Sequence, residues 1–134
     1  MKLTILFAAI CVLLFSSCNT GQKVPNTDID VASAFIRDIL ENDFAEAEKL
    51  VLQEETNKQF LEVFKKDYNS KNKSELENYR NADIIINEIS PVNDSVSIIN
   101  YSNSYKRDKS SKLKLVRVNG QWLVDLKYTF SGNM

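Results

Sequence analysis

The sequence predicts a single α+β domain in which N-terminal helices pack on a curved antiparallel sheet of about four strands. Apolar residues recur at helical spacing in the first half of the chain, and in the second half they alternate with polar residues as in half-buried strands. Because the helical segments all precede the strand segments, a βαβ arrangement is excluded. The 134 residues, 43% hydrophobic and 26% charged, have the composition of one globular domain.

The chain opens with a segment typical of an export signal. Lys2 precedes an apolar run over residues 3–15, which is too short to span a bilayer because a spanning helix needs roughly 20 residues. Residues 15–18, Phe-Ser-Ser-Cys, resemble the lipobox of bacterial lipoproteins. That resemblance implies removal of residues 1–17 as a signal peptide and acylation of Cys18.

Cysteine usage supports the lipid anchor independently. Cys11 lies in the predicted signal peptide, so Cys18 is left as the single thiol, without a partner for an internal disulfide. Acyl chains would hold the protein at a membrane without spanning it, at ~0.8 kcal/mol per buried CH₂. A secretory peptide with a chance cysteine is the alternative. We expect an acylated tether over residues 18–27 and one domain, residues 28–134, facing the periplasm of a bacterial cell envelope.

The first half of this domain predicts helices. Thr27 or Asp28 is the candidate N-cap of a first helix that ends near residue 41, and Asp43 has capping-box spacing at the start of a short second helix. A third helix covers about 56–68, and residues 74–79 predict one or two further turns. The apolar side chains at helical spacing are Ala32, Phe35, Ile36, Ile39, Leu40, Phe44, Ala47, Leu50, Val51, Phe60, Leu61, Phe64 and Tyr68.

The second half predicts strands. The first begins at Ile84 and ends at the turn residues 91–94, and the second covers 96–105 with a bulge at Ile98-Ile99, where the alternation slips. A third strand over 113–118 is followed by Asn119-Gly120, which predicts a type I′ hairpin turn. The last strand extends over 122–130. Its face toward the helices is expected to carry Trp122, Val124, Leu126, Tyr128 and Phe130.

This order of elements resembles the NTF2-like (cystatin-like) α+β cone. More closely, it resembles a family of short bacterial lipoproteins with a domain of unknown function, sometimes described as lumazine-binding-like. The segments that carry the resemblance are 31–35 (VASAF), 42–47 (NDFAEA) and 113–125 (LKLVRVNGQWLVD). The resemblance implies a small envelope-associated binding domain and supplies no catalytic motif.

Five aromatic residues are the candidate site. They are Trp122, Tyr101, Tyr128, Phe60 and Phe64. These rings either fill the core between helices and sheet or line a cavity there, and a cavity of this kind would suit a flat, partly apolar ligand. The sequence does not decide between the two.

The residue inventory excludes several kinds of chemistry. The chain has no histidine, which removes histidine-based triads and histidine metal ligation. Carboxylates are the remaining acid–base groups, but Asp125 is expected to point away from the Trp122 face. The sequence therefore predicts no catalytic residue, no metal site and no cofactor. With 17 basic and 18 acidic residues, nothing favours nucleic acid as a partner.

Charge is nevertheless uneven along the chain. Residues 28–62 carry a local balance of −7, and residues 106–117 carry +5. One interpretation of the basic segment is a surface that binds anionic lipid head groups or an acidic partner. The other is a solvated sheet edge whose lysines discourage strand pairing.

Three functions remain open. The leading hypothesis is a non-catalytic, lipid-anchored envelope domain that binds a small molecule or a partner protein. The alternatives are a cone-fold enzyme with an inward Asp or Tyr, and a structural lipoprotein that assembles through its sheet. A hollow interior would favour binding, and an inward buried carboxylate would favour catalysis. A filled interior with an exposed apolar sheet face would favour assembly.

Overall fold

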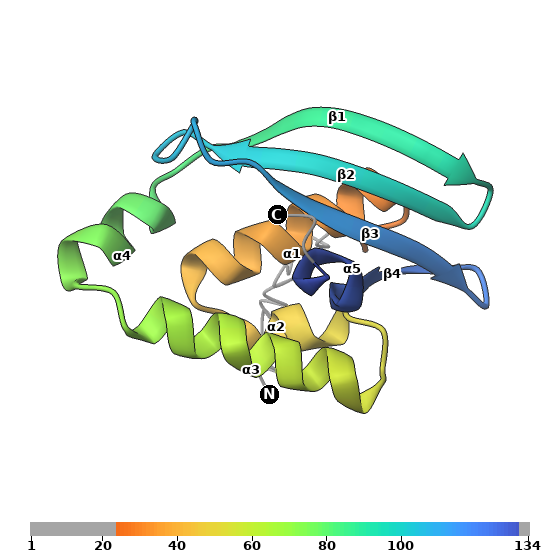
Figure 1. Ribbon diagram of the computed structural model, residues 1–134, viewed down its shortest axis with the longest axis horizontal. Helices are drawn as coiled ribbons and strands as arrows, with labels where there is room; N and C mark the ends of the chain where they lie inside the picture. The colour runs from red at the N-terminus through yellow and green to blue at the C-terminus, as the bar shows by residue number, and fades with distance from the viewer. Residues whose placement is uncertain (1–23, 132–134) are drawn as a thin grey trace, which may run out of the picture.

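The computed structural model describes residues 24–131, so the predicted signal peptide, Cys18 and most of the tether lie outside the described residues. Helices form one layer and an antiparallel sheet the other (Figure 1), which confirms the α+β class. The elements follow in the order α1 (Asp28–Glu41), α2 (Phe44–Lys49), α3 (Glu55–Asn69), α4 (Lys73–Arg80), β1 (Ile84–Asn93), β2 (Val96–Asn103), β3 (Ser111–Val118), β4 (Gln121–Asp125) and α5 (Leu126–Phe130).

The sheet is a meander with strand order β1-β2-β3-β4, and α1 contacts all four strands. The predicted hairpin turn is confirmed, because Asn119 and Gly120 both have the positive φ that a type I′ turn requires, at 50° and 79°. The core lies between α1 and the inner face of the sheet. Its fully buried members include Val31, Phe35, Ile99, Leu113, Leu115 and Val124.

Side-chain caps explain where the helices begin. Thr27 caps α1 in a capping box with Asp30, and Asp43 accepts from the Glu46 amide at the start of α2. Asn72 accepts from the Glu75 amide and begins α4 in the same way. The predicted further turns are thus a helix of eight residues.

Two expectations about the first strands are wrong. β1 does not end at Pro91 but continues to Asn93, which an edge strand permits because the missing proline N–H is not needed by a neighbour. The bulge is not at Ile98-Ile99, since β2 pairs with β3 in unbroken register. The irregularities lie instead on β1, between Ile86 and Glu88 and between Pro91 and Asn93.

The last predicted strand is also wrong beyond residue 125. β4 ends at Asp125, whose carboxylate accepts from the Lys127 amide and caps α5. Leu126, Thr129 and Phe130 follow helical rather than alternating spacing, and Thr129, which alternation would place outward, is fully buried. The segment 126–130 has apolar residues at both strand spacing and helical spacing, so its sequence pattern does not distinguish a strand from a helix.

Val51 is likewise not part of the second helix. It forms a parallel bridge with Val124, in which the Leu52 amide donates to the Val124 carbonyl at 2.9 Å and the Val124 amide to the Leu50 carbonyl at 2.8 Å. The segment after α2 is therefore attached to the edge strand β4 by a single bridge.

Candidate functional site

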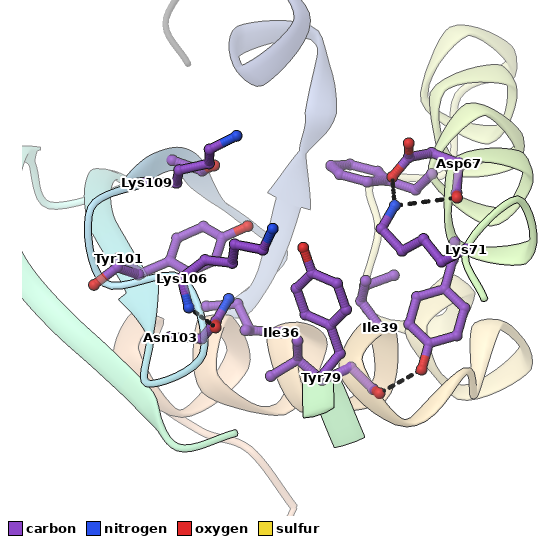
Figure 2. Close-up of a pocket in the computed structure, with 14 residues that line it drawn as sticks. Ile36, Ile39, Asp67, Lys71, Tyr79, Tyr101, Asn103, Lys106 and Lys109 are labelled. Atoms are coloured by element: carbon purple, nitrogen blue, oxygen red, sulfur yellow. Dashed lines mark hydrogen bonds and ion pairs between the residues drawn. The ribbon is translucent and has the colours of Figure 1, made fainter. Parts of the chain in front are cut away.

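A cavity of about 240 Å³ opens between helices α1, α3 and α4 and the end of the sheet where β2 leads into β3. Its floor is apolar, its walls carry three tyrosines, and its rim carries three lysines (Figure 2). The cavity is a recess that opens to solvent beside the packed core.

The floor comes mainly from one turn of α1. Ile36, Ile39 and Leu40 recur at positions three and four apart, which places them on one helix face toward the cavity. Phe64 of α3 completes the floor and packs edge-on against Phe130, with 5.1 Å between ring centroids.

The tyrosine walls come from three elements. Tyr68 of α3 is buried and donates its hydroxyl to the Leu40 carbonyl at 2.7 Å, so its position is fixed. Tyr79 of α4 packs edge-on against Tyr105, with centroids 5.0 Å apart. Burial raises the pKa of Tyr101 to about 12 and also raises the pKa of Tyr79. These hydroxyls stay protonated near neutral pH and can donate a hydrogen bond.

The lysine rim is not uniform. Lys71 is ion-paired with Asp67 and donates to the Asp67 carbonyl at 3.1 Å. Lys106 lies 5.0 Å from the centroid of the Tyr105 ring and, like Lys109, has no ion pair with a carboxylate among residues 24–131. Figure 2 shows Tyr79 between Lys106 on one side and the pair of Lys71 and Asp67 on the other. The rim therefore carries two uncompensated positive charges.

Only two of the five predicted site residues line this cavity, namely Phe64 and Tyr101. Phe60 stacks on Phe130 at 4.5 Å and belongs to the packed side. Trp122 is half-buried at the margin of the core with the Arg117 guanidinium 6.0 Å from its ring. Tyr128 is half-buried on α5, away from the cavity lining.

Sequence reasoning missed Tyr79 and Lys71, and it included Lys106 and Lys109 only as part of the basic segment 106–117. The basic segment 106–117 was the available signal, but its position at the β2–β3 connection became informative only once α4 was placed beside it. The interpretation of this segment as a sheet edge is wrong, because β3 lies inside the sheet and the edges are β1 and β4.

The cavity does not bring two carboxylates together. Asp67 is the one acid lining the cavity, and it is paired with Lys71. Asp125 is buried but lies outside the cavity lining, 3.6 Å from the Lys114 ammonium. Within residues 24–131, no cluster of three or more potential ligands could hold a metal ion. No helix in that range combines the length and apolar character needed to cross a bilayer.

Comparison with known proteins adds no identification. The chain matches no family model, no curated protein and no solved structure. The resemblance to NTF2-like lipoproteins therefore stays a prediction.

Proposed function

We propose that this chain is a lipid-anchored domain of the bacterial cell envelope that binds a small organic molecule without catalysing a reaction. The observation that carries the proposal is the open cavity with an apolar floor and tyrosine walls. Small-molecule sites are concave and mostly apolar, with a few polar groups that orient the ligand.

The size of the cavity restricts the ligand. At about 240 Å³ it lies below the ~300–1,000 Å³ range of common ligand pockets, so it suits one or two fused rings. The walls suit a flat body, because aromatic side chains pack on rings face-on or edge-on. A partner protein is less well served by a recess of this size, since stable interfaces bury ~800 Å² on each side.

Enzymatic activity is the second class, and the cavity offers it little support. General acid–base catalysis needs a titratable group within reach of the ligand with a pKa near the working pH. Asp67 is engaged with Lys71, and the raised pKa values of Tyr79 and Tyr101 move them away from neutrality.

Binding is tested with the full chain, purified in detergent, against a panel of flat one- and two-ring compounds by ligand-observed NMR. We expect at least one compound to bind the wild type and to lose binding in Ile39→Trp, which fills the floor. Val63→Trp is the matched control, because Val63 is 48% exposed on α3 and lies outside the cavity lining. Binding that survives in Ile39→Trp, or a panel without any binder, would contradict the proposal.

The anchor is tested separately through Cys18. We expect Cys18→Ser to abolish labelling by a radioactive fatty acid and to release the protein from membranes. Retention of that variant at the membrane with residues 1–17 still attached would overturn cleavage and acylation. Protease treatment of intact cells that removed the domain would overturn its periplasmic orientation.

A further inference from the structure

We infer that the ligand of this cavity is an organic anion whose carboxylate or phosphate is held by Lys106 and Lys109, while its rings occupy the tyrosine-lined interior. This inference rests on the proposed function and adds the chemical class of the ligand. It depends on three features of the rim: its charge, the fixed position of its loop, and a free hydroxyl beside it.

The charge comes from a difference between the three lysines. Asp67 neutralises Lys71, whose side chain is only 18% exposed. Lys106 and Lys109 face the same recess without a carboxylate partner in the described part of the chain. Because the apolar floor lowers the local dielectric, two unpaired ammonium groups at its mouth favour an anion over a neutral or cationic ligand.

The loop that carries Lys106 is held in place. The Asn103 side chain accepts hydrogen bonds from the Tyr105 amide at 3.0 Å and from the Lys106 amide at 2.9 Å. Upstream, the Asp83 amide donates to the Ser104 hydroxyl at 2.8 Å, which ties the loop to the start of β1. A loop fixed in this way loses little conformational entropy when it binds a ligand.

Tyr79 supplies the neutral donor. Its hydroxyl forms no hydrogen bond with another of residues 24–131, and Figure 2 shows it directed toward the space between Lys106 and Lys71. Lys106 lowers the pKa of Tyr79 less than burial raises it, so the hydroxyl keeps its proton. A protonated phenol beside the Lys106 ammonium adds a second donor, and a carboxylate or phosphate accepts hydrogen bonds from both.

The test compares 2-naphthoate with 2-naphthamide, which have the same rings and differ in charge. Isothermal titration calorimetry of the full chain in detergent measures both affinities. We expect naphthoate to bind about tenfold more tightly than naphthamide, which is the gain that one charge-assisted hydrogen bond allows. Raising the salt concentration should weaken the binding of naphthoate and leave the affinity for naphthamide unchanged.

Variants then assign the effect to the rim. Lys106→Gln combined with Lys109→Gln should reduce naphthoate affinity to that of naphthamide. Arg107→Gln is the matched control, because Arg107 has the same charge in the same loop but is exposed and outside the cavity lining. Circular dichroism of each variant checks that it is folded.

The outcomes separate the two proposals. Equal affinity for both compounds in the wild type overturns the anion inference and leaves small-molecule binding intact. An equal loss in Arg107→Gln also overturns it, because the effect is then long-range charge and not a built site. If neither compound binds, the inference is again overturned, and the compound panel decides whether the proposed function survives.

Discussion

The two ends of the helix–sheet interior both contain aromatic and aliphatic side chains, but one end is closed and the other is open. At the β4–α5 end, Val51, Val124 and Leu126 are at most 1% exposed, and Phe60 of α3 stacks on Phe130. At the α4 end, the tyrosines and lysines of α3, α4 and the β2–β3 connection surround an opening. Helix α1 takes part in both, since it contacts β4 and supplies the cavity floor.

The fold combines stability with a recess by closing one end of the interior and leaving the other open. A short helix, α5, turns back from the sheet and fills one end with Leu126 and Thr129. At the other end α4 contacts α1 but carries no buried residue. The tyrosine and lysine side chains at that end line the cavity and do not fill it. We therefore expect substitutions at the closed end to reduce stability, and substitutions at the open end to reduce ligand binding.

The largest expected effect is the replacement of Leu126 by alanine. Leu126 is fully buried, and removing such a side chain costs about 2–5 kcal/mol because it leaves a cavity. Ile39→Ala is the matched change at the open end. Since Ile39 already faces a space, we expect a loss of only about 1–2 kcal/mol. Urea denaturation measures both, and equal losses would show that the two ends are packed equally tightly.

A smaller loss is expected for Asn57→Ala, also at the closed end. The Asn57 carbonyl oxygen accepts from the buried Leu126 amide at 2.8 Å, which fixes the chain where β4 becomes α5. An unpaired buried amide costs about 1–3 kcal/mol. Asn69→Ala is the control, because Asn69 is an exposed asparagine in the same helix α3. Similar denaturation midpoints for the two variants would show that Asn57 does not hold this junction.

Two tyrosine hydroxyls at the open end are expected to have different roles. Tyr68→Phe removes the bond to the Leu40 carbonyl, and we expect a loss of about 0.5–1.5 kcal/mol. Tyr79→Phe removes a hydroxyl without a bond in the described chain, so its denaturation midpoint should equal that of the wild type while naphthoate affinity falls. A stability loss in Tyr79→Phe as large as in Tyr68→Phe would mean that Tyr79 serves packing and not the ligand.

The sequence was sufficient for the parts of the structure that local chemistry determines. Caps at Thr27 and Asp43 and the turn at Asn119-Gly120 are set by neighbours in the chain, and all three were predictable. The helix α5 was not, because its first amide is satisfied by Asn57, 69 positions earlier. The cavity could not be predicted from the sequence for the same reason. Tyr79 and Lys106 face one recess only because α4 and the β2–β3 loop meet in three dimensions.

The smallest expected effect tests whether packing or charge separates the two ends. Burial, together with Asp43, Glu46 and Glu41, raises the pKa of Asp38 from 3.8 to about 6. The folded state therefore prefers the protonated acid, and its stability should fall as the pH rises from about 4 to about 6 and stay constant above that. Solvent screening keeps this effect small, because Asp38 is partly exposed.

Asp38→Asn should remove that pH dependence. We expect the variant to melt at a higher temperature than the wild type at pH 7 and at nearly the same temperature at pH 3.5, as measured by circular dichroism. The difference between Leu126→Ala and Ile39→Ala should be the same at both pH values, since neither side chain titrates. If that difference instead changed with pH in parallel with Asp38, the contrast between the closed and open ends would come from the charge on α1, and the packing explanation would be wrong.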